Sequence, residues 1–308
     1  MIEKLRRAIN EVFIGKEQVV DDVLTCLIGQ GHVLLEDVPG VGKTTLARAV
    51  AASVGCSFGR IQFTPDTMPT DVVGVSVFNM KTSTFEYREG AIMKQVILAD
   101  EINRTSPKTQ SALLEAMAEG AVTVDGVRHP LPQPFMVIAT QNPIEFLGTY
   151  PLPEAQLDRF MMRLSIGYPD RENEIRLARG FMEGQTVEKI TPVCQDSSLL
   201  SLQRQAESVH VSDAILSYIQ TIIEKTREEE RFVLGASPRA MLFMVSACRA
   251  KAFLNQRDYV IPDDVKAIAI QVLHHRLQLT TEARIRNENT DAILRGILAG
   301  VPVPRNVS

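Results

Sequence analysis

The chain has 308 residues, of which 45% are hydrophobic and 23% charged, and this is enough to form the cores of about two domains. The formal net charge of -4 lacks the basic excess of a typical nucleic-acid-binding protein, so nucleic acid is the less expected partner. The four cysteines lie far apart and form no C-x-x-C pair, which favours free thiols in a reducing compartment and a cytoplasmic protein. No stretch approaches the roughly 18 apolar residues of a transmembrane segment.

The first part of the chain alternates between strand and helix patterns. Residues 2–13 carry apolar residues at helical spacing with charges between them, and we expect this helix to dock on the domain that follows. Up to about residue 166, most of the short apolar runs are followed by a loop and a helical pattern. This rhythm predicts a parallel sheet covered by helices on both faces. The apolar runs are "HVLLE", "GRIQF", "QVILAD", "FMVIAT" and "MRLSI".

Two β-hairpins interrupt this pattern. Two alternating segments flank a polar tip in "VSVFNMKTSTFEYREGA", and "GAVTVDGVRHPL" centres on Asp125-Gly126, a dipeptide suited to a two-residue turn. Phe78 and Met80 in the first hairpin are residues of local packing or, in a ring, contacts to a substrate. The two hairpins suggest structures that reach away from the sheet.

From Ser197 onward the sequence is helical in pattern. Apolar residues recur at intervals of three to four, and several segments begin with Ser, Asp or Pro, as helices do. We therefore predict an α/β domain over residues 1–188 and an all-helical domain over residues 189–308. The boundary lies between residues 168 and 192, where "EGQTVEKITPVCQDS" has the composition of a linker.

The segment "LLEDVPGVGKTTLARAVA" contains most of a phosphate-binding loop between a strand and a helix. In such a loop the backbone N–H groups and the helix N-terminus face the phosphates, and Lys43 reaches the outer ones. Asp37 stands where the usual pattern has its first glycine, and a carboxylate at about 8 Å would oppose a phosphate charge by roughly 2 kcal/mol. We expect Lys43, Mg²⁺ and the backbone donors to outweigh this repulsion. The predicted nucleotide-binding residues are Gly40, Val41, Gly42, Lys43, Thr44 and Thr45, with Thr44 as a ligand of Mg²⁺.

A second acidic motif follows about fifty residues later. The apolar strand in "QVILADEINR" ends at Asp100-Glu101. Asp100 is the predicted second residue of the Mg²⁺ site, and Glu101 is the predicted general base for a water that attacks the γ-phosphate of ATP. Because a lone Asp-Glu pair is common after a strand, it is the combination with the phosphate loop that indicates ATP hydrolysis.

Three further polar residues are ambiguous in isolation. Asn142 follows the strand "FMVIAT", where an amide could position the attacking water, although Asn before Pro is more often a turn residue. Arg159 and Arg239 are typical of exposed arginines that pair with a neighbour, and only an assembly would bring either one to the γ-phosphate of another subunit.

The order of "VPGVGKT", "ILADEINR", "ATQNPIEFLGTYPLPEAQLDRF" and "GASPRA", with a hairpin before and after "ILADEINR", resembles the MoxR family of AAA+ ATPases over nearly the whole chain. The block from Leu98 to Phe160 carries the most specific part of this resemblance. It implies a P-loop AAA+ core with two hairpin inserts and a helical lid. It also implies that Asn142 is sensor 1, that Arg159 is the arginine finger and that Arg239 is sensor 2 on the lid. Asp37 departs from the family pattern, and the departure bears on nucleotide affinity.

The resemblance further implies a hexameric ring that uses ATP to remodel or activate partner proteins in a chaperone-like role. Such partners often contain a von Willebrand factor A domain. Two alternatives stay open from the sequence, namely a chelatase-type motor subunit and an ATP-dependent interaction switch without substantial turnover. A nucleic-acid motor of the same fold is disfavoured because the hairpin tips offer only Lys81, Arg128 and His129 as cations.

Overall fold

The computed structural model describes residues 1–143 and 148–304. The chain packs as two compact units. The first unit is formed by Met1–Leu24, His32–Arg159 and Leu164–Leu200, and the second by Thr25–Gly31, Phe160–Arg163 and the chain from Ser201 onward. The placing of a domain boundary between residues 168 and 192 stays a prediction. Among the described residues, no helix is long and apolar enough to cross a membrane.

A five-stranded sheet has the order β2-β5-β8-β1-β9, and all of it except Met162 and Arg163 of β9 belongs to the first unit. The pairs β2–β5, β5–β8 and β8–β1 are parallel, as the sequence predicts. Every residue of β5 is buried, because a parallel sheet is covered on both faces and its central strands are nearly all apolar. The strands are β1 (Val33–Glu36), β2 (Phe58–Gln62), β5 (Val96–Asp100), β8 (Met136–Gln141) and β9 (Met162–Leu164).

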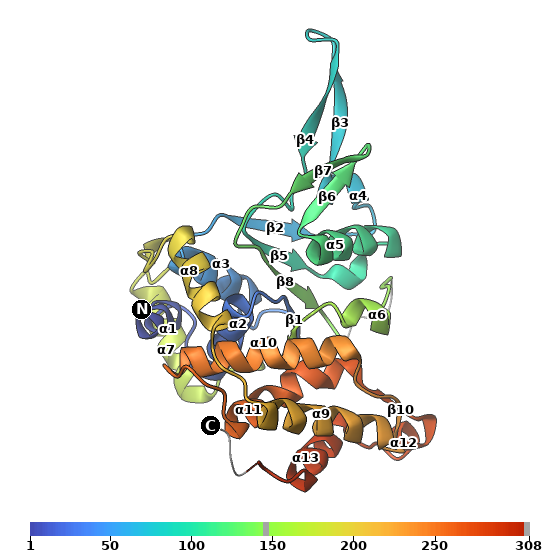
Figure 1. Ribbon diagram of the computed structural model, residues 1–308. Helices are drawn as coiled ribbons and strands as arrows, with labels where there is room; N and C mark the ends of the chain where they lie inside the picture. The colour runs from blue at the N-terminus through green and yellow to red at the C-terminus, as the bar shows by residue number, and fades with distance from the viewer. Residues whose placement is uncertain (144–147, 305–308) are drawn as a thin grey trace. The chain divides into compact units, whose positions relative to one another are not determined.

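Helices cover both faces of this sheet. Figure 1 shows α3 on one face and α4 and α5 towards the other. The N-terminal helix α1 buries Ile2, Leu5 and Ile9 and packs against α3, which confirms that it docks on the domain. The helices up to residue 207 are α1 (Ile2–Asn10), α2 (Glu17–Ile28), α3 (Lys43–Ser53), α4 (Pro69–Val73), α5 (Pro107–Glu119), α6 (Glu154–Leu157), α7 (Arg171–Met182) and α8 (Asp196–Glu207), with 3₁₀ turns η1 (Ile102–Arg104) and η2 (Val187–Lys189). The last residues of α2 and of α8 belong to the second unit.

Both predicted hairpins are present. The hairpin of β3 (Gly74–Asn79) and β4 (Thr84–Glu89) extends away from the sheet, and the hairpin of β6 (Ala121–Val124) and β7 (Val127–Pro130) lies beside its base (Figure 1). Asp125 and Gly126 both have positive φ, as a tight two-residue turn requires. The rings of Tyr87 and His129 stack at 3.8 Å between centroids. This stack joins the two hairpins.

The second unit is mostly helical. Ser212 and Ser237 begin α9 and α10 by accepting the backbone N–H of the third helical residue, as the sequence pattern predicts. The predicted helical lid is present, with one addition, because β10 and β11 form a short antiparallel pair. Strands this short produce no alternating pattern that a sequence reading could detect. The elements are α9 (Asp213–Glu228), β10 (Phe232–Leu234), α10 (Pro238–Leu254), α11 (Pro262–Leu273), η3 (His274–Arg276), β11 (Gln278–Leu279), α12 (Thr281–Ile285) and α13 (Thr290–Gly300).

Candidate active site

The phosphate loop connects β1 to α3. Gly40 and Gly42 adopt φ values of +87° and +93°, which side chains with a Cβ rarely tolerate, and Gly42 is the N-cap of α3. A Cβ placed on Gly40 would meet no heavy atom within 4 Å, so there is space beside the loop. The first N–H groups of α3 lack partners within the helix and form a site suited to an anion. Lys43 Nζ donates to the backbone oxygen of Asp37 at 2.8 Å.

The carboxylate of Asp37 has a different role from the one the sequence suggests. Asp37 is buried, and its Oδ2 accepts hydrogen bonds from Ser165 Oγ at 3.1 Å, from the backbone N–H of Gly167 at 3.0 Å and from the backbone N–H of Ile166. Its negative charge is therefore shared among three donors that follow β9. Asp37 ties the start of the phosphate loop to the connection between β9 and α7.

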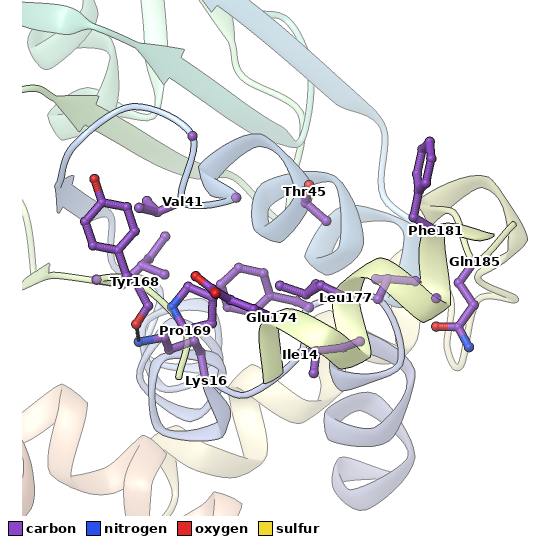
Figure 2. A pocket seen from close by; sticks show the side chains of 17 residues that line it. Ile14, Lys16, Val41, Thr45, Tyr168, Pro169, Glu174, Leu177, Phe181 and Gln185 are labelled. Atoms are coloured by element: carbon purple, nitrogen blue, oxygen red, sulfur yellow. Dashed lines mark hydrogen bonds between the residues drawn. The ribbon is translucent and has the colours of Figure 1, made fainter. Parts of the chain in front are cut away.

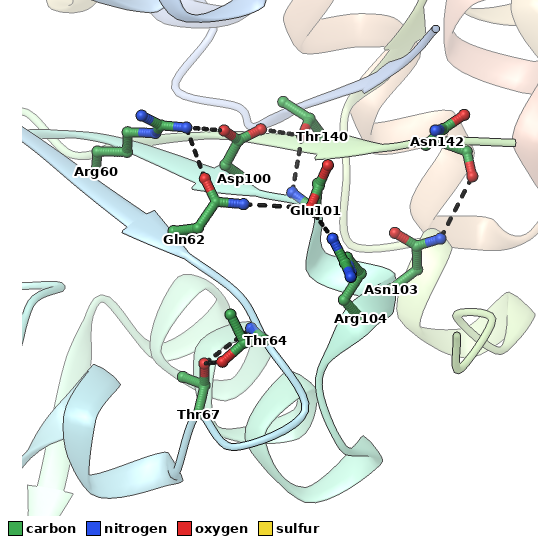
Figure 3. Close-up of polar contacts among 10 residues, drawn as sticks. All are labelled: Arg60, Gln62, Thr64, Thr67, Asp100, Glu101, Asn103, Arg104, Thr140 and Asn142. Atoms are coloured by element: carbon green, nitrogen blue, oxygen red, sulfur yellow. Dashed lines mark hydrogen bonds and ion pairs between the residues drawn. The ribbon is translucent and has the colours of Figure 1, made fainter. Parts of the chain in front are cut away.

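Asp100 lies at the carboxyl end of β5. Thr140 Oγ1 of the neighbouring strand β8 donates to Asp100 Oδ1 at 2.7 Å, and Arg60 of β2 forms an ion pair with Oδ2 at 2.7 Å (Figure 3). The strand order explains this arrangement, because β5 lies between β2 and β8. The carboxylate predicted to help hold Mg²⁺ is thus oriented by one neighbouring strand and ion-paired by the other.

Glu101 follows β5 in the left-handed region, with φ 57° and ψ 50°. A residue other than glycine is uncommon there, and such strain is often found at functional sites. The backbone N–H of Glu101 donates to Thr140 Oγ1 at 2.9 Å. The side-chain Oε2 accepts from Gln62 Nε2 at 3.2 Å and from Arg104 Nη1 at 3.0 Å. The predicted general base is therefore held by its own neighbours in this conformation (Figure 3).

The Lys43 ammonium of the phosphate loop interacts electrostatically with the acidic pair Asp100-Glu101. Burial lowers the pKa of Lys43, and the negative charges of Asp100, Asp37 and Glu101 act against this shift. Since Coulomb interactions fall with distance, these effects mark the acidic pair as neighbours of the Lys43 ammonium. The fold thus brings together the phosphate loop and the end of β5, which are about fifty residues apart in sequence.

A cavity of about 490 Å³ opens beside the phosphate loop. Its lining combines the loop with the turn after α1 and with α7, and Figure 2 shows Glu174 and Leu177 of α7 facing Val41 and Thr45. Much of the lining is apolar, which is typical of pockets that take a planar ring. Lys16 Nζ, at one end, donates to the backbone oxygen of Tyr168 at 2.9 Å. The residues beyond the loop include Val12, Phe13, Ile14, Ile166, Gly167, Tyr168, Pro169, Leu177 and Phe181.

The residues Asn142, Arg159 and Arg239 are placed differently. Asn142 is buried directly after β8, and the side chain of Asn103 donates to its backbone oxygen at 3.5 Å. Arg159 is half-buried at the end of the turn after α6, and its Nη1 donates to the backbone oxygen of Leu114 in α5 at 2.8 Å. Arg239 is exposed in the first turn of α10, in the second unit. The catalytic roles of all three stay predictions.

Several residues at this site escaped the sequence analysis. Arg60 and Gln62 are two residues apart on β2, so their side chains point to the same face of the sheet. Gln62 Oε1 accepts a hydrogen bond from Arg60 Nη2 at 2.6 Å. Their spacing is visible in the sequence, but only the strand order reveals that β2 pairs with β5. The cavity residues of α7 were missed for a similar reason, since an amphipathic helix does not indicate which loop it faces.

Comparison with known proteins agrees with this geometry. Residues 32–162 match the family described as "ATPase family associated with various cellular activities (AAA)", and residues 224–297 match "AAA lid domain". The chain is 50% identical to "Uncharacterized protein YeaC" of Bacillus subtilis, over 99% of this chain and 95% of that protein. It is 40% identical to "Chaperone MoxR1" of Mycobacterium tuberculosis, over 99% and 83% of the two chains.

A solved structure from Cytophaga hutchinsonii superimposes with a TM-score of 0.91 at 36% identity, over 99% of this chain and 95% of that one. The fold and the sequence similarity therefore agree over nearly the full length. The chain belongs to the MoxR family of AAA+ ATPases.

Proposed function

We propose that this protein binds ATP with Mg²⁺ and hydrolyses it in an oligomeric ring, a hexamer, to remodel or activate partner proteins. The observation that carries the proposal is the grouping of Lys43, Asp100 and Glu101 beside the glycine loop and its cavity. This set supplies an anion-binding loop, a carboxylate for a metal and a carboxylate for a proton.

Each residue has a distinct part in the proposed reaction. The loop from Gly40 to Thr45 and the Lys43 ammonium bind the phosphates, and the cavity beside the loop takes the base of the nucleotide. Glu101 accepts the proton of the attacking water, and Asn142 orients that water. Arg159 of a neighbouring subunit and Arg239 stabilise the charge that develops on the γ-phosphate.

The residues present fit a magnesium ion. Thr44 and Asp100 would hold it, because Mg²⁺ prefers oxygen ligands and commonly uses only one or two protein groups together with phosphate oxygens. When bound, Mg²⁺ neutralises negative charge on the phosphates. Arg60 would have to release Asp100 Oδ2 if that oxygen were to become a ligand, and Gln62 and Arg104 would have to release Glu101.

The hairpins are the proposed contact with partner proteins. Phe78 and Phe85 pack edge to face at 5.3 Å on the hairpin of β3 and β4, yet both remain largely exposed, and Met80 at its tip is 86% exposed. Exposed large apolar side chains of this kind are common where a protein binds another. A partner with a von Willebrand factor A domain is the expectation that comes from the family.

Steady-state ATP hydrolysis should be measured against protein concentration, with mass photometry on the same samples. Wild-type turnover should rise with ring formation, whereas Glu101→Gln and Arg159→Ala should bind ATP and lose turnover. ATP binding and ring formation without turnover in the wild type would favour the interaction switch. A chelatase-type motor would be favoured if turnover responded to a metal-insertion partner instead of a protein substrate.

A further inference from the structure

Arg276 is an arginine buried inside the second unit, at the end of η3, with only 4% of its surface exposed. Its guanidinium donates to the backbone oxygen of Phe160 at 2.6 Å, to that of Met161 at 3.3 Å and to that of Val272. It also lies 5.0 Å from the ring centroid of Phe243, a distance suited to a cation–π interaction. Arg276 therefore holds the backbone of residues 160–161 through hydrogen bonds to both carbonyl oxygens.

The neighbouring His275 lies against the same peptide oxygen. Its Nε2 is 3.0 Å from the backbone oxygen of Phe160 and 2.7 Å from Arg276 Nη1, and because a neutral ring nitrogen either donates or accepts, it makes only one of these two hydrogen bonds. Burial, followed by the positive charge of Arg276, holds the pKa of His275 well below its usual value. The imidazole is accordingly neutral near neutral pH, which avoids a second positive charge against the guanidinium. Two side chains of η3 thus converge on one peptide oxygen.

The segment held by Arg276, Phe160 and Met161, begins immediately after Arg159. Phe160–Arg163 belongs to the second unit, although the chain on either side of it belongs to the first. Arg159 is bonded directly to Phe160, whose side chain is fully buried. A catalytic arginine must be positioned closely, since a displacement of about 1 Å can lower a rate by about 10²-fold. The backbone directly after Arg159 is held in place because the carbonyl oxygen of Phe160 accepts a hydrogen bond from Arg276.

We propose that Arg276 is a positioning residue for Arg159, so that an arginine of the lid sets the finger that each subunit offers to its neighbour. The proposal rests on the proposed function, in which Arg159 acts on another subunit's ATP. Arginine suits this role because its planar guanidinium presents several N–H donors in a fixed arrangement. Lysine keeps the charge but cannot hold two carbonyls in the same geometry.

The test uses two substitutions of Arg276 in the full-length chain, with Arg284→Met as the matched control. Arg284 also donates to a backbone oxygen of the second unit, that of Leu279 at 3.1 Å, but it is exposed, and within the described part of the chain its hydrogen bond goes to Leu279 and not to Phe160. Arg276→Met and Arg276→Lys are first checked for thermal unfolding and for binding of a fluorescent ATP analogue. We expect both to bind nucleotide and to lose about 10²-fold in turnover, while Arg284→Met keeps wild-type turnover.

Mixed rings then separate a defective finger from a defective ATP site. A subunit with Glu101→Gln cannot hydrolyse ATP but has an intact Arg159, and it should restore turnover to a neighbour whose own finger fails. The mixture of Arg159→Ala with Glu101→Gln is the reference. If Arg276 acts through Arg159, mixing an Arg276 variant with Glu101→Gln should recover at least half of the reference turnover. Mixing it with Arg159→Ala should recover none.

Each outcome has a distinct meaning. Failure of the reference mixture would count against the shared active site and thus against the proposed function. If the reference recovers but neither Arg276 variant does, the proposal is overturned, since the defect then lies within the same subunit. Wild-type turnover of both Arg276 variants would overturn it as well. Arg276→Lys decides the case if Arg276→Met fails to fold, and misfolding of both would assign Arg276 to lid stability alone.

Discussion

The carboxylate of Asp37 accepts the backbone N–H of Gly167 at 3.0 Å, although the two residues lie 130 positions apart in the chain. Asp37 begins the phosphate loop, and Gly167 lines the cavity beside it. A single buried side chain therefore fixes the distance between the loop and one wall of the cavity. Because of this contact, we expect that restoring the glycine of the usual phosphate-loop pattern at position 37 would destabilise the site.

Replacing Asp37 by glycine should lower the free energy of unfolding of the protein and its affinity for ATP. The substitution leaves the N–H groups of Ile166 and Gly167 without their buried acceptor, which costs about 2 kcal/mol of the free energy of unfolding. Urea unfolding and titration with a fluorescent ATP analogue measure the two effects. Asp66→Asn, an exposed change, is the control. Tighter ATP binding by Asp37→Gly would instead mean that the carboxylate repels the phosphates.

Removal of the Arg60 side chain should lower the Mg²⁺ concentration needed for half-maximal ATP hydrolysis. The guanidinium is ion-paired with Asp100 Oδ2, so it competes with a cation for the same oxygen. The pair is partly exposed, and we expect a shift of a few fold at most, consistent with the small energies of such pairs. Hydrolysis by Arg60→Ala and by the exposed control Lys94→Ala is followed as Mg²⁺ is varied. An increased Mg²⁺ requirement in Arg60→Ala would show that Arg60 helps to orient Asp100.

A carboxylate placed in the cavity should weaken nucleotide binding. Leu177 lines the cavity from α7, whereas Ile175 on the same helix does not line it and is similarly exposed. Leu177→Glu brings a charge to a largely apolar surface, and a cost of about 1.4 kcal/mol would reduce ATP affinity about tenfold. Ile175→Glu should bind ATP as the wild type does. Equal affinities in the two variants would place the base of the nucleotide elsewhere.

Acid should destabilise the first unit through His32. This histidine is half-buried, its Nδ1 accepts the backbone N–H of Val137 at 3.1 Å, and desolvation of the ring lowers its pKa from 6.5 to about 4. The unfolded chain therefore binds more protons than the folded chain between these two values. Stability is complete above pH 6.5 and falls as the pH drops towards 4, by up to about 3 kcal/mol.

Urea unfolding across this pH range measures the effect. His32→Asn, which keeps an acceptor near the Val137 N–H but does not titrate there, should show a flatter dependence than the wild type. His210→Gln is the control, because the side chain of His210 is exposed. His275 is buried with a lowered pKa and should keep part of the acid sensitivity in every variant. Identical pH profiles for the wild type and His32→Asn would contradict the assignment.

Local sequence patterns are enough to predict most of the helices and strands and the chemistry of the main motifs. Periodic apolar runs are local, so the strands, both hairpins and most of the lid helices could be predicted, and Lys43, Asp100 and Glu101 belong to short motifs whose residue types are tied to phosphate and metal chemistry. The short strands β10 and β11 fell below the length at which alternation becomes visible.

Which residues meet depends on how distant segments of the chain pack together. The strand order places Arg60 and Thr140 on either side of Asp100. The backbone N–H groups that follow β9 donate to Asp37. Arg276 of η3 donates to the backbone oxygen of Phe160. These contacts join positions 40 to 130 residues apart. Periodicity and motif spacing record what each segment can form, but the pairing of distant segments depends on packing, which no local pattern encodes.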